Sequence, residues 1–163
     1  MILGILSDTH DRLDAMKAGL SALKSAGAEY YIHCGDVGGE SILDQFAGLP
    51  AAFVWGNNDF ERRILARYAE QLGIRCLGVF GELELDGKLL AITHGDDPIL
   101  NHRLLDSQKY DYFFQGHTHI PKDQRIGRTR LINPGALHRA RPKTVAVLDL
   151  QTDDLRYIEI PLV

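Results

Sequence analysis

The first 72 residues alternate between short apolar runs and segments with helical periodicity, and no other feature restricts the fold as strongly. Residues 2–6 are rich in Ile and Leu and end at Ser7-Asp8, as buried strands do. Residues 12–26 carry apolar side chains at helical spacing and end before Gly27. Strands separated by helices predict βαβ units and a parallel sheet. Further strands are expected at 30–34 and 51–55, and further helical segments near 42–46 and 64–72.

The pattern changes from about residue 76 onward, where short apolar segments follow one another. Asp86-Gly87 is a hairpin signal, and one helix is expected at roughly 98–107. A chain of 163 residues suits one domain over 1–163 with one full hydrophobic core. We expect an α/β domain that passes into a mixed or antiparallel half, with two packed sheets and helices outside. The strands expected in this half are 79–85, 89–94, 112–115, 130–133, 145–150 and 155–160.

Charge and apolar content restrict the partners and the location. The net charge of -4 argues against a broad basic surface for nucleic acid, although a single phosphate group could bind locally. The first apolar run is too short for a signal peptide or for a membrane span, which needs about 20 apolar residues. Cys34 and Cys76 lack metal-binding spacing and indicate buried, reduced thiols. We therefore expect a cytoplasmic protein without a membrane span.

Five of the expected strands end in clusters of Asp, His and Asn framed by glycine. The carboxyl ends of strands in an open α/β sheet form the edge where ligands bind, so one rim would receive every cluster. Each cluster alone has a simpler explanation, since Asp8 and Asp59 could cap helices and His94 could merely end a strand. Such separate explanations would be needed five times, each time for a residue type that can bind a metal. A single common site is therefore the more economical interpretation. The clusters are Asp8-Thr9-His10, Gly35-Asp36, Gly56-Asn57-Asn58-Asp59, His94-Gly95 and Gly116-His117-Thr118-His119.

The donor types in these clusters indicate a pair of divalent metal ions. Imidazole, carboxylate and amide groups without thiolates suit Mn, Fe, Ni or Zn better than Mg or Ca alone. His117 and His119 would project to the same side if the strand continued through them, which would make them a chelating pair. Two metals about 3.5–4 Å apart need a bridging carboxylate. Asp36, held in a glycine turn, is the candidate for the bridge.

The order D-x-H, G-D, G-N-x-D, H-G and G-H-x-H resembles the calcineurin-like metallophosphoesterases. Together with Asn133-Pro134-Gly135, it is similar in particular to the small bacterial and archaeal phosphodiesterases of the YfcE-like or MJ0936-like group. The resemblance spans residues 5 to about 142 and implies a four-layer α/β sandwich, with two mixed β-sheets flanked by helices. By matching positions, it implies one metal held by Asp8, His10, Asp36 and His119, and a second held by Asp36, Asn57, His94 and His117.

Position 58 departs from the family pattern. Many members carry a histidine there that is taken to assist the transition state or the leaving group, whereas this chain has Asn58. An amide can donate a hydrogen bond to a phosphoryl oxygen but cannot give a proton to a leaving alkoxide at neutral pH. Asn58 and Asp59 are the catalytic-site candidates beside the metal ligands. Asp59 is expected to orient Asn57, Asn58 or a ligand histidine.

These assignments predict a metal-dependent phosphodiesterase that hydrolyses a small phosphate ester with a metal-bridging hydroxide. The centre would hold two divalent ions, with Mn favoured over Ni, Fe or Zn. After the negative charges of Asp8, Asp36 and the hydroxide are subtracted, about one positive charge would remain, and it would attract an anionic phosphate. A phosphomonoesterase or a nucleotide pyrophosphatase could use the same centre. A non-catalytic interaction scaffold is the alternative of another class, because a subunit of the cargo-sorting retromer resembles these enzymes. The physiological substrate and the oligomeric state, a homo-oligomer included, stay open.

The remaining polar residues near the motifs have simpler expected roles. His33 is expected to be a satisfied core histidine or a neighbour of a ligand, and His102 to be solvated on its helix. Asp96 and Asp97 are expected to cap the helix that begins near Pro98. Two features are left between alternatives. His138 is either at the rim or in a remote loop, and the basic cluster of Arg139, Arg141 and Lys143 is either solvated or holds a phosphate.

Overall fold

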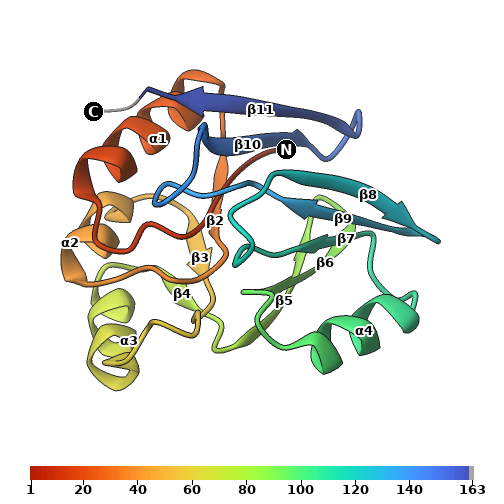
Figure 1. Ribbon diagram of the computed structural model, residues 1–163, viewed down its shortest axis with the longest axis horizontal. Coiled ribbons are helices and arrows are strands. Elements are labelled where there is room, and N and C mark those ends of the chain that lie inside the picture. Colours follow the sequence, from red (N-terminus) through yellow and green to blue (C-terminus); the bar gives the residue numbers. More distant parts are fainter. Residues whose placement is uncertain (162–163) are drawn as a thin grey trace.

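The computed structural model describes residues 1–161, and these form two mixed β-sheets packed between helices (Figure 1). Apolar clusters lie between the first sheet and its helices, between the two sheets, and between the second sheet and its helix. The layers are therefore helix, sheet, sheet and helix, which confirms the predicted four-layer α/β sandwich. The last two residues of the expected domain, 162 and 163, lie outside the described residues.

The first sheet has the strand order β11-β10-β1-β2-β3-β4. Its centre is parallel, because the connections from β1 to β4 all pass through helical segments. The C-terminal hairpin adds two antiparallel strands beside β1. The strands are β1 (Ile2–Leu6), β2 (Tyr30–His33), β3 (Ala51–Phe53), β4 (Arg75–Cys76), β10 (Lys143–Asp149) and β11 (Asp154–Ile160).

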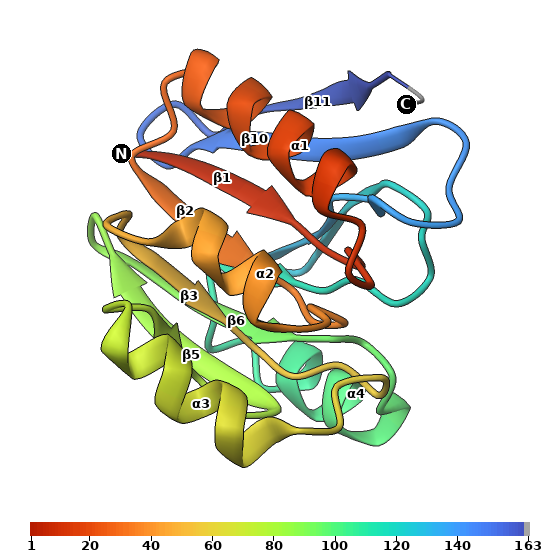
Figure 2. The same ribbon diagram turned by 90° about the vertical axis from the view of Figure 1, so that its left-hand side faces the viewer.

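The helices that connect these strands cover one face of the first sheet (Figure 2). The longest one buries Met16, Leu20 and Leu23, which recur at the spacing that predicted it. The predicted polar segment after the second strand contains one short helix and one 3-10 turn. The elements are α1 (Leu13–Ser25), α2 (Glu40–Leu43), the 3-10 helix η1 (Asp44–Phe46) and α3 (Arg62–Gln71). None of the helices in residues 1–161 has the length and apolar character that a membrane span requires.

The second sheet has the order β5-β6-β7-β9-β8, with a parallel centre and antiparallel edges. One helix, α4 (Pro98–Asp106), packs on its outer face through Leu104. As predicted, Asp97 caps this helix by accepting hydrogen bonds from the Ile99 and Leu100 amides, both at 3.0 Å. The strands are β5 (Phe80–Leu85), β6 (Lys88–Thr93), β7 (Tyr112–Phe114), β8 (Lys122–Ile126) and β9 (Thr129–Asn133).

Two of these strands, β4 and β8, were not predicted. The first has only two residues, and the second reads Lys-Asp-Gln-Arg-Ile with four exposed side chains. Strand β8 is defined by its pairing with β9 and by Arg130, whose guanidinium binds both Asp123 oxygens at 2.8 Å. A polar edge strand has no alternation of apolar and polar residues, so it can be recognised only from its pairing with the neighbouring strand.

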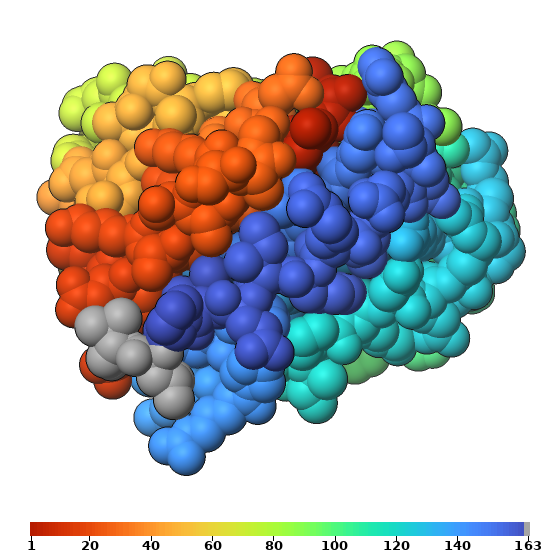
Figure 3. Space-filling view, turned by 90° about the horizontal axis from the view of Figure 1, so that it is seen from above, coloured from red at the N-terminus to blue at the C-terminus, as the bar shows by residue number. Residues whose placement is uncertain are grey.

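The C-terminal hairpin ties the two halves of the molecule together. Figure 3 shows β10 and β11 (blue) lying between α1 (orange) and the β8 region (cyan). Tyr157 on β11 donates a hydrogen bond of 2.7 Å to the Lys122 carbonyl at the start of β8. Both cysteines are free, and Cys34 is buried as predicted while Cys76 is only half-buried.

Candidate metal centre

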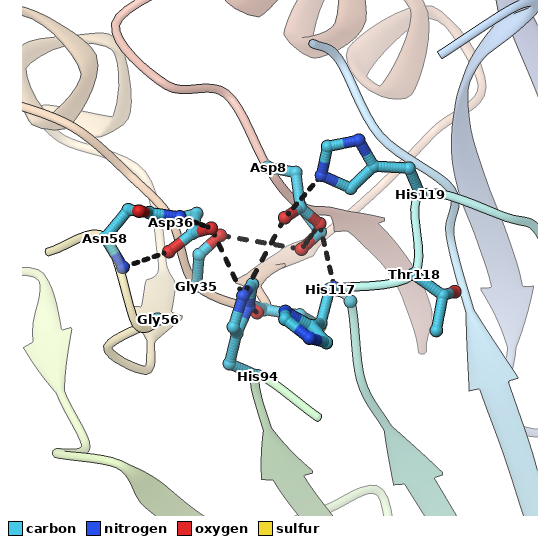
Figure 4. A network of polar contacts seen from close by, with 12 residues as sticks. Asp8, Gly35, Asp36, Gly56, Asn58, His94, His117, Thr118 and His119 are labelled. Carbon is cyan, nitrogen blue, oxygen red and sulfur yellow. Dashed lines mark hydrogen bonds and ion pairs between the residues drawn. The ribbon is translucent and has the colours of Figure 1, made fainter. Parts of the chain in front are cut away.

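Five loops, which follow β1, β2, β3, β6 and β7, meet at one edge of the sandwich (Figure 4). Backbone hydrogen bonds connect them within each sheet. The Asp8 amide donates to Gly35 O at 3.0 Å and the Gly116 amide to His94 O at 2.8 Å. A third contact crosses between the sheets, because the His117 amide donates to Asp8 Oδ2 at 3.1 Å. The convergence predicted from the strand ends is therefore present.

Two buried carboxylates form the middle of this site. Asp36 Oδ2 lies 3.3 Å from His10 Nε2 and 3.2 Å from His94 Nε2. Asp8 Oδ1 lies 3.2 Å from His119 Nε2 and 3.8 Å from His94 Nε2. Two groups of residues each offer ligand atoms that all lie within 4.8 Å of one another. They are Asp8, His10 and His119, and Asp8, Asp36 and His94.

Three buried atoms in the centre lack a hydrogen-bond partner among the described residues: Asp8 Oδ1, His10 Nε2 and His94 Nε2. The other carboxylate oxygen of Asp8 is fully used, since it accepts from Ser7 Oγ at 2.6 Å and from the His117 amide. An unpaired buried polar atom is costly, so such atoms point to a missing partner. One oxygen and two imidazole nitrogens facing each other are a donor set that fits a divalent cation.

The orientation of His94 is fixed by the backbone of the other sheet. Its Nδ1 lies 2.8 Å from the carbonyl of Cys34, which can only accept, so Nδ1 carries the hydrogen and Nε2 faces the carboxylates. Burial opposes protonation of this ring, but the carboxylates of Asp36 and Asp8 outweigh burial and raise the pKa of His94 to about 9. In the metal-free protein, His94 Nε2 is therefore protonated, and this proton lies where a bound cation would contact the same nitrogen.

Asn58 is hydrogen-bonded to Asp36 through both its backbone and its side chain. Its amide N–H donates to Asp36 Oδ1 at 2.8 Å, and its Nδ2 donates to Asp36 Oδ2 at 2.9 Å. Burial raises the pKa of Asp36, but the facing imidazole of His94, 3.2 Å away, and the hydrogen bonds from Asn58 outweigh it and hold the pKa well below its usual range. The residue that replaces the family's histidine therefore orients the carboxylate predicted to bridge the metals.

The expected strand geometry of His117 and His119 is wrong. Strand β7 ends at Phe114, and both histidines have left-handed backbone conformations, with φ of 68° and 61°. Side chains therefore do not alternate there. The loop nevertheless brings both rings to the centre, His119 against Asp8 and His117 edge-on to His94 with ring centroids 5.1 Å apart.

A cavity of about 370 Å³ opens above the carboxylates. Asn57 lines it but is exposed, and within residues 1–161 its side chain forms no hydrogen bond to the carboxylates. His138 lies at the rim, its ring centroid 5.0 Å from that of His10, and burial together with the charges of His10 and Arg12 lowers the pKa of His138. Only Arg139 of the basic cluster reaches this cavity. The lining residues are His10, Asp36, Asn57, Asn58, His117, His119, His138 and Arg139.

Neither Asp8 nor Asp59 caps a helix. The N-cap residues of α1 and α3 are Arg12 and Glu61, and neither helix has a side-chain cap. The buried carboxylate of Asp59 instead accepts from the amides of Gly38, at 3.1 Å, and Gly56, at 2.8 Å. Asp59 thus joins the backbones of the loops after β2 and β3, and within residues 1–161 its side chain forms no hydrogen bond to Asn57, Asn58 or a histidine, which it was expected to orient.

Ser7 and Asn133 support the centre, although the sequence predicted no role for either. Ser7 orients Asp8, as described above. Asn133, at the end of β9, donates through Nδ2 to Gly116 O at 2.7 Å and to Thr118 Oγ1 at 3.1 Å, which fixes the loop that carries His117. The Asn-Pro-Gly sequence at a strand end was the available signal for the second residue.

Comparisons with known proteins agree with this geometry. The calcineurin-like phosphoesterase superfamily domain matches residues 1–153. Phosphodiesterase MJ0936 of Methanocaldococcus jannaschii is 29% identical over 163 residues, which cover 97% of this chain and 98% of that protein. A solved structure described as a novel archaeal phosphodiesterase has a TM-score of 0.91 at 28% identity and covers 98% of this chain and 100% of its own.

The fold also matches that of YfcE, a phosphoesterase from E. coli. That structure has a TM-score of 0.68 at 22% identity and covers 99% of this chain and 100% of its own. The resemblance stated from the five motifs is thereby confirmed, because the family match extends over nearly the whole chain. The protein belongs to the calcineurin-like phosphoesterase superfamily.

Proposed function

We propose that this phosphoesterase acts on phosphodiesters and that its centre holds two divalent metal ions. The unpaired atoms Asp8 Oδ1, His10 Nε2 and His94 Nε2 are the observation that carries the proposal. They come from two loops, one after β1 in the first sheet and one after β6 in the second, and a cation is the partner that would satisfy an oxygen and two imidazoles together. The proposed ligands, assigned by the family motifs, are Asp8, His10, Asp36 and His119 for one ion, and Asp36, Asn57, His94 and His117 for the other. The two groups of neighbouring ligand atoms contain five of these seven residues, namely Asp8, His10, Asp36, His94 and His119.

The ions, when bound, would polarise the phosphoryl oxygens and lower the pKa of a water molecule that attacks phosphorus. The ligand set carries too few negative charges to neutralise two divalent ions, and this favours an anionic substrate. Asp8 and Asp36 are the two carboxylates of the ligand set, and Asn57 is neutral, so two divalent ions would keep an excess of positive charge. A carboxylate at position 57 would reduce that excess.

The residues around the ligands have proposed roles in holding the substrate and the carboxylates. Asn58 would hold Asp36 in place through its two hydrogen bonds. Asp59 would act more indirectly, by joining the loops that carry Asp36 and Asn57. Arg139 lines the cavity and is exposed, so its guanidinium is available to a phosphoryl oxygen.

The relatives support the choice of a diester, since MJ0936 and the archaeal structure are both described as phosphodiesterases. The donor set supports manganese as the native metal, with nickel, iron or zinc as alternatives. The buried free thiol of Cys34 supports a reducing, cytoplasmic location.

The test compares bis-p-nitrophenyl phosphate with p-nitrophenyl phosphate, with chelator and with added Mn²⁺. Hydrolysis of the diester should need Mn²⁺ and should exceed hydrolysis of the monoester. An Asp36→Asn variant purified in parallel controls for contaminating phosphatases. Faster hydrolysis of the monoester would favour a phosphomonoesterase. Metal binding without hydrolysis of either compound would favour an interaction scaffold.

A further inference from the structure

Two buried side chains join the loops after β1 and β2 behind the proposed ligands. Thr9 stands between Asp8 and His10 in the chain, and His33 is the last residue of β2. Both are 0% exposed, and His33 Nε2 lies 2.9 Å from Thr9 Oγ1. Neither residue belongs to the proposed ligand set, so metal binding and substrate binding do not account for this pair.

The hydrogen bonds of the pair form a chain with a single direction. The Gly35 amide donates to His33 Nδ1 at 3.2 Å, so Nδ1 has no hydrogen. Nε2 of the neutral ring must then carry the hydrogen and donate to Thr9 Oγ1, and Thr9 donates its own hydrogen to Val37 O at 2.7 Å. Burial, with the nearby charge of His94, lowers the pKa of His33 to about 3, which agrees with a neutral ring.

The two loops joined by this chain have strained backbones. Asp8, His10 and Asp36 have φ of 55°, 43° and 53°. This is the left-handed backbone conformation, which residues other than glycine adopt only rarely. Each such residue costs on the order of 1 kcal/mol or more and persists only where its surroundings enforce it. The loops also exchange backbone bonds, since the His10 amide donates to Asp36 O at 3.1 Å. Neighbouring contacts therefore enforce the positions of all three proposed ligands.

We propose that Thr9 and His33 are positioning residues that hold Asp8, His10 and Asp36 at the separation which metal binding requires. The proposal rests on the metal centre described above. Without the Thr9 hydroxyl, the His33 N–H and the Val37 carbonyl lose their partner, and the strained loops lose the buried side-chain link next to Asp8, His10 and Asp36. The consequence should be a weaker metal site, beyond any general loss of stability.

The test uses Thr9→Val, which keeps the shape of the side chain and removes its hydroxyl. Its dissociation constant for Mn²⁺, measured by calorimetry, should rise about 10- to 100-fold, as for other residues that orient metal ligands. Thr9→Ser keeps the hydroxyl and should bind Mn²⁺ as the wild type does. Urea unfolding of the metal-free proteins would measure the change in stability separately.

Thr129→Val is the matched control. Thr129 is also 0% exposed, and its hydroxyl donates to Tyr110 O at 2.7 Å. It lies at the amino end of β9, whereas the centre lies at the carboxyl ends of the strands. This variant should lose stability and bind Mn²⁺ normally. Equal Mn²⁺ affinities for Thr9→Val, Thr129→Val and the wild type would overturn the proposal.

A measurement on the wild-type protein does not depend on the folding of any variant. Nitrogen-15 shifts of His33, in metal-free and Zn²⁺-loaded protein, should report hydrogen on Nε2 and none on Nδ1 between pH 5 and 8. Hydrogen on Nδ1, or titration of His33 near its ordinary pKa, would refute the chain of hydrogen bonds. A wild-type protein that binds no metal would instead refute the proposed function, and the positioning role with it.

Discussion

At the scale of single residues, each of the two side chains Asp8 and His94 has one polar atom in hydrogen bonds and one polar atom without a partner. Asp8 uses one oxygen for Ser7 and His117 and keeps the other free. His94 uses Nδ1 for Cys34 O and keeps Nε2 free. Polar partners of this kind are what set the orientation of metal ligands in proteins. The free atoms therefore point at one another because of contacts behind them.

The proposed sharing of Asp36 by both ions can be tested by metal content. Asp36→Asn removes the carboxylate expected to contribute to both sites, so the protein should retain neither ion after dialysis against metal-free buffer. His10→Ala should weaken one site and retain the other. His102→Ala, an exposed histidine on α4, is the control and should keep both. Elemental analysis provides the stoichiometries, and two ions retained by Asp36→Asn would refute the shared ligand.

Position 58 should determine which leaving groups are accepted. Asn58 cannot supply a proton, and general acid assistance is worth about 10²–10⁴-fold only where the leaving group needs a proton. The wild type should therefore hydrolyse aryl phosphodiesters measurably and unactivated alkyl phosphodiesters poorly. Asn58→His should improve kcat/KM for alkyl substrates more than for aryl substrates at saturating metal.

The Asn58→His substitution has a second effect besides adding a proton donor. Because Asn58 Nδ2 donates to Asp36 Oδ2, its replacement also removes a bond that orients a proposed ligand. Asn58→Gln, which keeps the amide but extends it, is a control for that loss. A loss of activity for both substrate types in both variants would mean that Asn58 serves to position Asp36 and that the position is no acid site.

At the scale of elements, strand ends and glycines determine how closely the loops approach. A Cβ on Gly116 would overlap Ser7 Oγ and lie 2.7 Å from Asp8 Oδ2. The loop after β7 can therefore pack on the loop after β1 only because residue 116 has no side chain. This contact joins the two sheets at the site, so one glycine controls how the second sheet presents His117 and His119.

Gly116→Ala should accordingly weaken metal binding, since Ser7 and Asp8 must move to admit the methyl group. Gly73→Ala is the control, because Gly73 has φ of 75° but nothing within 4 Å of an added Cβ. That variant should lose about 1 kcal/mol of unfolding free energy through backbone strain alone and keep its Mn²⁺ affinity. Calorimetric titration with Mn²⁺ and urea unfolding measure the two effects. Normal Mn²⁺ affinity in Gly116→Ala would contradict the close-packing argument.

At the scale of the whole molecule, metal binding should be coupled to protons. The pKa of His94 is raised to about 9 in the metal-free protein, so this ring is protonated at pH 7 and must lose its proton to become a ligand. Metal binding at pH 7 should therefore release about one proton from His94, and apparent affinity should increase with pH up to about 9. Hydrolysis should in turn decline steeply below about pH 6, because acid opposes both metal binding and formation of the attacking hydroxide.

Calorimetry in buffers with different ionisation enthalpies measures this release directly. The observed heat of Mn²⁺ binding should vary linearly with the ionisation enthalpy of the buffer at pH 7, and the contribution of His94 to this dependence should fall by about half at pH 9. A heat that is independent of the buffer at pH 7 would mean that His94 is neutral before the metal binds.

The sequence by itself determined the layers of the fold and the chemistry of the site. Apolar periods located most strands and helices to within a few residues, because burial of one face imposes those periods on the chain. The order of the Asp, His and Asn clusters predicted the candidate donors, because their chemistry is a property of the side chains alone. These inferences needed only local patterns.

Tertiary structure decided what depends on residues far apart in the chain. Strand β8 exists through its pairing with β9, and Asp59 binds Gly38 and Gly56 where a helix cap had been an alternative. His117 and His119 reach the centre through left-handed turns that no strand period describes. The physical reason is the same in each case. Strained backbones and buried polar side chains are stabilised by contacts from other loops, and those contacts form only when both sheets have packed together.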